Sequence, residues 1–149
     1  MTTRRMTPIA LATAIFTSLT VGCIGPGFSD KDPGIVGDLK IEIPKTATSF
    51  LPETNSVAFL MPNDQWRDYV AKYYPDKQLS QSPASKETDG GVPPMCIPAF
   101  RSGTKLTSWT TGAKIQYRNT DKYAVRGVVV TPDCEPGKAY VQWSLSNPK

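Results

Sequence analysis

The sequence contains no histidine, and this absence limits the chemistry that its other reactive side chains could perform. Histidine is the most common general base and the most common metal ligand in proteins. Without it, the chain cannot form a Ser-His or Cys-His nucleophile pair. Any catalysis would have to use carboxylates, a serine or a lysine.

Ser102 and Lys105 have the S-x-x-K spacing of the penicillin-recognising serine enzymes. In those enzymes the serine begins a helix, so that the lysine lies one turn later and can reach it. Here Gly103 and the β-prone residues that follow predict a loop leading into a strand, and the partner motifs S-D-N and K-T-G are absent from the sequence. We therefore interpret Ser102 as a turn residue.

Two groups of carboxylates could in principle act as acid–base or metal-binding sites. Asp64 and Asp68 stand one helical turn apart. The expected helix start accounts for Asp64, and an expected i,i+4 ion pair with Lys72 accounts for Asp68. Asp30, Asp32 and Asp38 could hold a hard cation only weakly, because a flexible segment forms no cage. We predict no catalytic residue, no metal site and no cofactor.

Five aromatic side chains raise the possibility of a glycan or peptidoglycan site, because flat rings stack on sugar faces: Trp66, Tyr69, Tyr73, Tyr74 and Trp109. The first three share one face of a predicted helix, which favours a place in the core. Tyr74 and Trp109 are less constrained and keep the sugar site open as an alternative.

Residues 1–23 have the three-part pattern of a bacterial export signal. Arg4 and Arg5 precede an apolar stretch from Ile9 to Val21, which ends at Gly22-Cys23. As a helix, the 13 residues from Ile9 to Val21 would span roughly 20 Å, which is short of a ~30 Å hydrocarbon core. We expect a cleaved signal peptide over residues 1–22, on the general secretory route ahead of the twin-arginine route.

The segment Leu19-Thr20-Val21-Gly22-Cys23 resembles the lipobox of bacterial lipoprotein precursors. In that family the cysteine carries a diacylglyceryl group and becomes the first mature residue. Thr20 departs from the pattern, which usually has leucine at that position. The resemblance implies a lipidated Cys23 and a protein anchored on the extracytoplasmic face of the cell membrane. Residues 23–37 are expected to form the lipidated N-terminus and a flexible tether, because the segment after Cys23 is rich in Gly and Pro and has few apolar side chains. A secreted protein without lipid is the alternative.

The sequence has three cysteines, an odd number for an exported chain. If lipid takes Cys23, then Cys96 and Cys134 remain as a pair, and a disulfide between them suits a compartment outside the cytoplasm. Such a bridge would close a loop of about 40 residues and stabilise the fold by roughly 4 kcal/mol. Two free buried thiols are the alternative.

The pattern of residues 38–149 predicts one domain. Strict alternation predicts a strand over Leu39–Ile43, and an apolar run predicts a buried strand over Ser56–Met61. Next comes a helix capped by Asn63 and stopped by Pro75, with its apolar face formed by Trp66, Tyr69, Val70 and Tyr73. Residues 76–94 are polar and predict a loop.

Turn signals divide the C-terminal third into four predicted strands: Lys105–Trp109, Ala113–Arg118, Tyr123–Thr131 and Lys138–Leu145. We therefore predict an α+β fold, a largely antiparallel sheet with a C-terminal meander and one main helix packed against it. The run Phe59-Leu60-Met61-Pro62 before an aromatic helix, and Arg126 to Tyr140 with its Pro-Gly turn, resemble small exported proteins of uncharacterised function from high-GC Gram-positive bacteria. That resemblance implies no activity.

Charge and residue types favour binding over catalysis as the function. Removing Arg4 and Arg5 with the signal leaves 15 basic against 13 acidic residues, which is too small a bias for a nucleic-acid partner. We expect a non-enzymatic envelope lipoprotein whose partners are the membrane, through its lipid, and an envelope protein or cell-wall component. A histidine-free hydrolase and a carrier of a small ligand or glycan are the alternatives.

Strand alternation predicts a binding face on the solvent side of the sheet. Tyrosine and arginine often carry binding energy at interfaces. The residues expected to share this face are Gln116, Arg118, Arg126, Tyr140 and Gln142. The prediction depends on strand register, because a slip of one residue turns each side chain to the other face.

Overall fold

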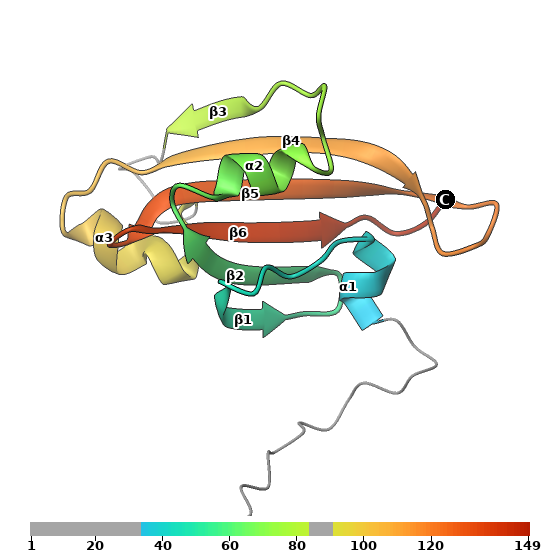
Figure 1. Ribbon diagram of the computed structural model, residues 1–149, viewed down its shortest axis with the longest axis horizontal. Helices are drawn as coiled ribbons and strands as arrows, with labels where there is room; N and C mark the ends of the chain where they lie inside the picture. Colours follow the sequence, from blue (N-terminus) through green and yellow to red (C-terminus); the bar gives the residue numbers. More distant parts are fainter. Residues whose placement is uncertain (1–33, 84–90) are drawn as a thin grey trace, which may run out of the picture.

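Six antiparallel strands form one sheet in the order β1-β2-β6-β5-β4-β3, with a few short helices beside it (Figure 1). The structure is a computed structural model that describes residues 34–83 and 91–149. It confirms the predicted α+β fold dominated by an antiparallel sheet. In chain order the elements are α1 (Gly34–Leu39), β1 (Thr48–Pro52), β2 (Ser56–Pro62), α2 (Trp66–Ala71), β3 (Ser80–Pro83), the 3-10 helix η2 (Pro94–Cys96), α3 (Ile97–Arg101), β4 (Thr107–Gln116), β5 (Tyr123–Glu135) and β6 (Lys138–Leu145).

The C-terminal meander β4-β5-β6 forms the centre of the sheet, and β2 joins it along the free edge of β6. Ser56 pairs with Ser144 at one end of this contact, and Pro62 pairs with Lys138 at the other. Strand β2 is buried along nearly its whole length because both of its faces are covered. Pairing between β2 and the last strand holds the two halves of the chain together.

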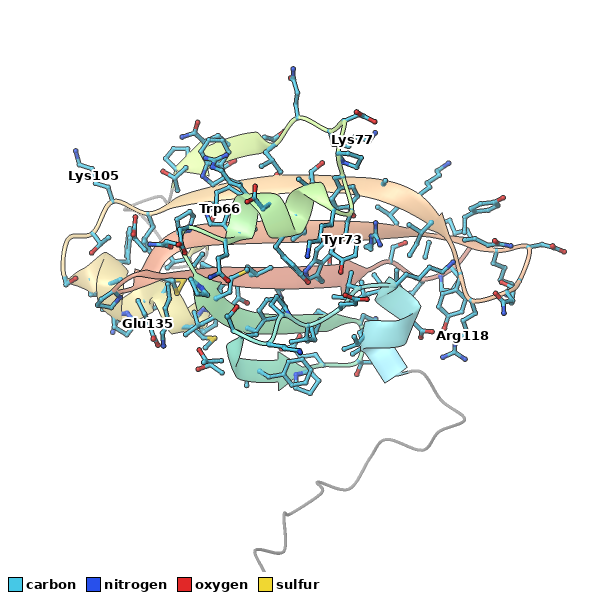
Figure 2. The ribbon with its side chains drawn as sticks, in the orientation of Figure 1. Trp66, Tyr73, Lys77, Lys105, Arg118 and Glu135 are labelled. Carbon is cyan, nitrogen blue, oxygen red and sulfur yellow. A yellow bond between two sulfur atoms is a disulfide. The ribbon has the colours of Figure 1, made fainter. Side chains whose placement is uncertain are left out.

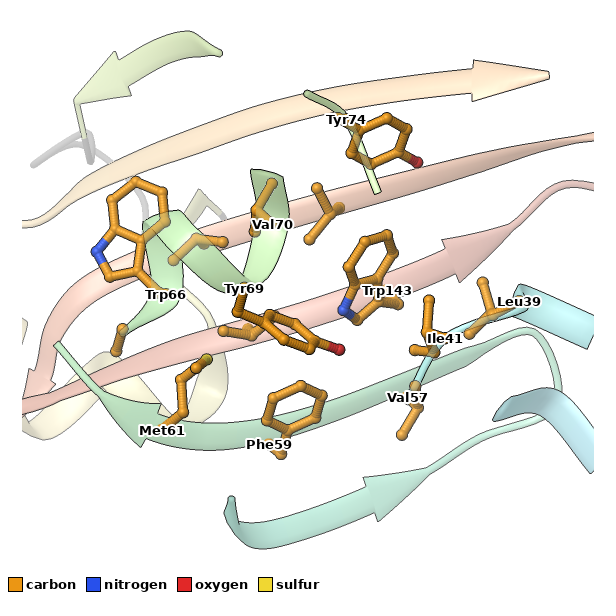
Figure 3. Packing of buried hydrophobic residues seen from close by; sticks show 14 of the residues in the cluster. Leu39, Ile41, Val57, Phe59, Met61, Trp66, Tyr69, Val70, Tyr74 and Trp143 are labelled. Atoms are coloured by element: carbon orange, nitrogen blue, oxygen red, sulfur yellow. The ribbon is translucent and has the colours of Figure 1, made fainter. Parts of the chain in front are cut away.

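One face of the sheet, here called the α2 face, carries the main core (Figure 3). The predicted apolar face of α2 packs onto it, with Trp66, Tyr69 and Val70 buried. Trp143 of β6 is fully buried beneath this helix, and its ring centroid lies 5.1 Å from that of Tyr73. The aromatic residues of α2 are therefore packing residues, as their helical spacing predicts.

The opposite face, here called the α3 face, is covered at one end by η2 and α3. Cys96 and Cys134 form the predicted disulfide there, with their Cα atoms 4.4 Å apart. Both cysteines are buried in a second apolar cluster with Leu60, Leu106 and Tyr140. This bridge ties the covering segment to β5, while the rest of the α3 face has no such cover in the part of the chain that the structure describes.

Strand β4 is one continuous strand, so the predicted turn at Thr111-Gly112 is wrong. Gly112 pairs with Gly127 on β5, and a Cβ atom at Gly112 would lie 3.1 Å from the carbonyl oxygen of Arg126. The glycine therefore permits a close approach of β4 and β5, and it does not end the strand. Strand β5 also continues to Glu135, and only Pro136 and Gly137 form the turn, where Gly137 has a φ of +72°.

The predicted strand over Leu39–Ile43 is also wrong, although its alternation does describe burial. Leu39 is the last residue of α1, and the following residues are irregular, yet Leu39 and Ile41 are buried and Glu42 is exposed. This segment packs against the core in an irregular conformation and pairs with no strand. Alternating burial alone cannot distinguish such a segment from a strand.

Asn63 does not cap α2, whose N-cap is Gln65 without a side-chain hydrogen bond. The Asn63 amide instead donates to the Asp133 carboxylate at 2.6 Å, and its carbonyl oxygen accepts from the Asp133 backbone N–H at 3.1 Å. The side chain therefore connects the start of α2 to β5. Sequence reasoning had no signal for this partner, which lies 70 residues away.

The folded domain starts earlier than the predicted boundary at residue 38. Gly34 to Gly37, predicted as part of the tether, belong to α1, and Ile35 and Val36 pack against the core. The predicted signal peptide, Cys23 and the rest of the tether lie outside the described residues. The predicted loop over 76–94 contains β3, which pairs with β4.

Candidate functional site

The five residues of the predicted binding face do not share one face. Gln116 and Gln142 do point to the α3 face, in alternation with core residues on the α2 face. Tyr140 points the same way but is buried beneath the disulfide cluster. Arg126 lies on the α2 face and is buried, and Arg118 stands beyond the end of β4. The prediction of a common wet face is therefore wrong for three of its five members.

Arg126 is buried because the aromatic core provides it with partners. Its Nη1 donates to the carbonyl oxygens of Leu39 at 3.0 Å and Lys40 at 3.3 Å, and its Nε donates to the Tyr74 hydroxyl at 3.1 Å. The guanidinium carbon lies 5.0–5.5 Å from three ring centroids, those of Tyr73, Tyr74 and Trp143. Carbonyl oxygens and ring faces stabilise a cation, so this arginine connects residues 39–40 to the sheet.

Arg118 also holds the α1 segment. It stands in the left-handed region, with a φ of +50°, just after β4. Its Nε and Nη2 donate to the two oxygens of Asp38 in α1 at 2.8 and 3.0 Å. Arg118 is half-exposed, with 46% of its side-chain surface accessible, whereas the Asp38 side chain is largely buried at 11%. Asp38 is therefore an ion-pair partner and does not form a cation site with Asp30 and Asp32, which lie outside the described residues.

A groove lies at the end of the sheet where the β4–β5 hairpin meets residues 146–149. Its volume is ≈ 720 Å³, and it is lined by Lys114, Tyr123, Ala124, Val125, Ser146, Asn147 and Lys149. The side chains of Tyr123 and Val125 are 55% and 46% exposed and are two of the four large exposed apolar residues of the described chain. The groove thus combines apolar surface with lysines on both sides.

Backbone pairing holds the walls of this groove in place. Tyr123 and Lys149 exchange two backbone hydrogen bonds, at 3.1 and 2.9 Å. The backbone N–H of Ser146 donates to the carbonyl oxygen of Val125 at 2.9 Å, and the Ser146 hydroxyl accepts from the Val125 N–H at 2.8 Å. On the other side Lys114 pairs with Val125 across the strands. The exposed side chains therefore project from a fixed backbone.

Positive charge gathers at the same end of the molecule. We call residues 114–125, residues 145–149 and α1 together the hairpin end (Figure 1). It contains four cationic side chains, Lys114, Arg118, Lys122 and Lys149, all exposed, against the two carboxylates of Asp38 and Asp121. Because Asp38 already pairs with Arg118, Asp121 is the remaining acidic side chain within these three ranges, against three lysines.

The S-x-x-K residues lie at the opposite end of the molecule, where Figure 2 labels Lys105 and Glu135. Ser102 is the C-cap of α3, and its hydroxyl donates to the carbonyl oxygen of Ala99 at 2.7 Å. A hydroxyl used in this way ends a helix and does not begin one. The interpretation of Ser102 as a turn residue is therefore confirmed.

The carboxylates and aromatic rings that the sequence suggested as functional groups do not come together in one site. Asp64 and Asp68 are both exposed, but Asp64 precedes α2 and the described residues show no ion pair between Asp68 and Lys72, so the predicted roles of these two carboxylates are wrong. Within residues 34–83 and 91–149 no three metal-ligating side chains gather. Tyr74 is buried, and burial raises the pKa of its hydroxyl, which donates to the Arg126 carbonyl oxygen at 2.7 Å. The Arg67 guanidinium lies 4.3 and 4.7 Å from the ring centroids of Trp66 and Trp109. These contacts occupy the rings that were considered for a glycan site.

Sequence reasoning missed the groove because its residues come from three separate segments. Tyr123 and Val125 alternate with the buried Ala124, which is a signal for two exposed side chains on one face. Nothing in the sequence shows that Lys114 stands across from Val125 or that Lys149 returns to Tyr123. Those neighbours follow from the register.

No protein-family model matches the chain, and no curated protein or solved structure is significantly similar to it. Among the described residues, no helix is long and apolar enough to cross a membrane.

Proposed function

We propose that this chain is an exported lipoprotein, anchored by a lipid on Cys23 to the extracytoplasmic face of the cell membrane, and that its domain acts by binding another envelope component. The signal pattern of residues 1–23 and the lipobox-like Val21-Gly22-Cys23 support the anchor. The Cys96–Cys134 bridge supports export, because disulfides persist mainly outside the cytoplasm.

The observation that carries the binding role is the groove at the hairpin end. Soluble proteins bury most large apolar side chains, and a rigid exposed cluster beside charged groups is typical of an interaction site. Tyr123 offers a flat amphipathic ring, and Lys114 and Lys149 offer charge on either side. In contrast, the Arg126 guanidinium is buried and already donates to partners within the domain.

The lipid-free mature chain, from residue 24 onward, is expected to bind saturably to envelope fragments, and Tyr123→Ala/Lys114→Ala is expected to weaken that binding about tenfold. The factor follows from truncating two contact residues at roughly 1 kcal/mol or less each. Co-sedimentation over a range of envelope concentrations measures it. Phe50→Ala/Lys105→Ala is the matched control, because it removes an exposed apolar and a basic side chain elsewhere.

Equal affinity of the two double variants would count against the groove. Turnover of an ester, peptide or glycan substrate, abolished by changing one carboxylate or serine, would replace binding with a hydrolase. Prior treatment of the envelope with protease, or with a solvent that extracts lipid, indicates the class of component bound.

A further inference from the structure

We propose that the hairpin end binds the anionic surface of the bilayer in which the chain is anchored, so that Lys114, Lys122, Lys149 and Tyr123 form a second membrane contact beside the lipid. The inference rests on the proposed function, since it names the partner of the same groove. Three observations carry it: the position of α1, the charge of the hairpin end, and the exposed Tyr123 and Val125.

The first observation is that the folded domain begins at this end. Asp38 of α1 is bound by Arg118, which follows β4 at the hairpin (Figure 2). Gly34 lies four residues earlier in the same short helix, which is about 6 Å along the axis. The segment that leads back to Cys23 therefore joins the domain beside the hairpin end.

The length of that segment limits how far the domain can stand from the bilayer. Ten residues separate Cys23 from Gly34. Whatever their conformation, a chain of this length reaches at most about 40 Å, and as a flexible coil it would average roughly 18 Å. A lipid on Cys23 thus keeps the hairpin end at high effective concentration next to the surface.

The second observation is charge complementarity. Lys114, Lys122 and Lys149 are exposed, and within the hairpin end Asp121 is the acidic side chain that remains beside them, because Asp38 is paired with Arg118. A basic side chain near an anionic leaflet strengthens binding by about fivefold. Together with Tyr123, three such groups give a free protein a weak partition onto an anionic surface that is measurable at high lipid concentration, and they orient a protein that is already tethered.

The third observation is the kind of apolar surface at the groove. Tyrosine is enriched at the level of lipid headgroups, where its ring contacts acyl chains and its hydroxyl stays hydrated. Tyr123 is 55% exposed, and its neighbour on the same face, Val125, is 46% exposed. A ring and an aliphatic side chain flanked by lysines match the polarity gradient of a membrane interface.

The test uses the lipid-free mature chain from residue 24 and two kinds of vesicle, one of equimolar phosphatidylglycerol and phosphatidylcholine and one of phosphatidylcholine alone. The chain is expected to co-sediment with the anionic vesicles only, and to be released when salt rises from about 0.1 M to 1 M, as the Debye length falls from ~10 to ~3 Å. Lys114→Glu/Lys122→Glu is expected to lower the partition coefficient by at least about 25-fold.

Lys45→Glu/Lys105→Glu is the matched control, because it makes the same change in net charge at two exposed lysines away from the hairpin end. Lys105 lies at the opposite end (Figure 2), and Lys45 adjoins Thr46, whose hydroxyl donates to Gln65 just before α2. The proposal requires this control to bind like the unchanged chain, with the disulfide and circular dichroism intact in both variants. Equal losses in the two variants, or equal binding to neutral vesicles, would overturn it.

The outcomes also separate this inference from the proposed function. If vesicles fail to bind while envelope fragments still bind through Tyr123 and Lys114, then the partner is a protein or a cell-wall polymer and only the membrane contact is refuted. If Cys23 carries no lipid, then the anchor is refuted, whatever the vesicles show.

Discussion

Replacing Arg126 with alanine is expected to lower the free energy of unfolding by about 3–4 kcal/mol, a large share of the 5–15 kcal/mol that is usual for a domain. The change leaves the carbonyl oxygens of Leu39 and Lys40 and the Tyr74 hydroxyl without a buried donor. It also removes the cation that lies against three aromatic rings. Urea unfolding followed by tryptophan fluorescence measures the loss.

Two further variants identify the cause of that loss. Arg118→Ala removes the other arginine that holds the α1 segment, and its cost is expected to be smaller, about 1–2 kcal/mol, because Arg118 is half-exposed although its partner Asp38 is largely buried. Arg126→Met keeps most of the side-chain volume and isolates the lost hydrogen bonds. Amide exchange over residues 34–43 is expected to accelerate most in Arg126→Ala. Similar costs for Arg118→Ala and Arg126→Ala would contradict this account of the core.

Reducing the Cys96–Cys134 bridge is expected to destabilise the domain by roughly 4 kcal/mol. The unfolded chain has more conformational entropy without the bridge, and this favours unfolding. The two cysteines are 38 residues apart, and their bridge holds η2 and α3 against β5. Denaturant unfolding with and without a strong reductant measures the difference. The apolar contacts of Leu106 and Tyr140 depend on that cover and are expected to loosen with it.

The control for the disulfide is Cys96→Ala/Cys134→Ala, whose stability should not respond to reductant. Its own cost includes the small cavities left by two buried sulfur atoms, so the response of the unchanged protein to reductant is the cleaner value. An unfolding midpoint that is the same in oxidised and fully reduced protein would refute the role of the bridge.

The parts of the fold with a strong local signal were predictable from the sequence. Strand β6 has the predicted bounds, Lys138–Leu145, because apolar and polar residues alternate along it. The cysteine pair was also predicted correctly, as were Trp66, Tyr69 and Val70 on the apolar face of α2, although the helix ends at Ala71 and the predicted fourth residue, Tyr73, lies beyond it. In each case periodicity or simple counting of residue types carries the information.

The errors arise where a residue's partner is distant in the sequence. Arg126 was expected on the wet face from an assumed strand register, yet carbonyl oxygens 86 and 87 residues away and three aromatic rings make it a core residue. Gly112 was read as a turn, although it serves a close strand contact with Gly127. Propensity describes single residues, whereas these positions depend on neighbours across the sheet.

The candidate site was predictable only in its type. The sequence predicts binding by tyrosine and basic side chains on the solvent side of a sheet. Two of the residues that it names, Gln116 and Gln142, lie on the α3 face in the structure. The Gln116 amide, however, donates to the Thr120 carbonyl oxygen at 2.9 Å and supports the hairpin turn. The exposed apolar residues of the groove are Tyr123 and Val125, and the pairing of Tyr123 with Lys149 could not be derived from the sequence alone.

The central claim is that Cys23 anchors an exported chain, and intact-mass analysis of the protein from a bacterium with lipoprotein processing tests it most directly. We predict a chain that begins at Cys23, carries the mass of a diacylglyceryl group, fractionates with the membrane and contains the Cys96–Cys134 linkage. Cys23→Ser should carry no lipid. A chain that begins at another residue without lipid, or one that keeps residues 1–22 and has two alkylatable thiols at Cys96 and Cys134, would contradict the claim.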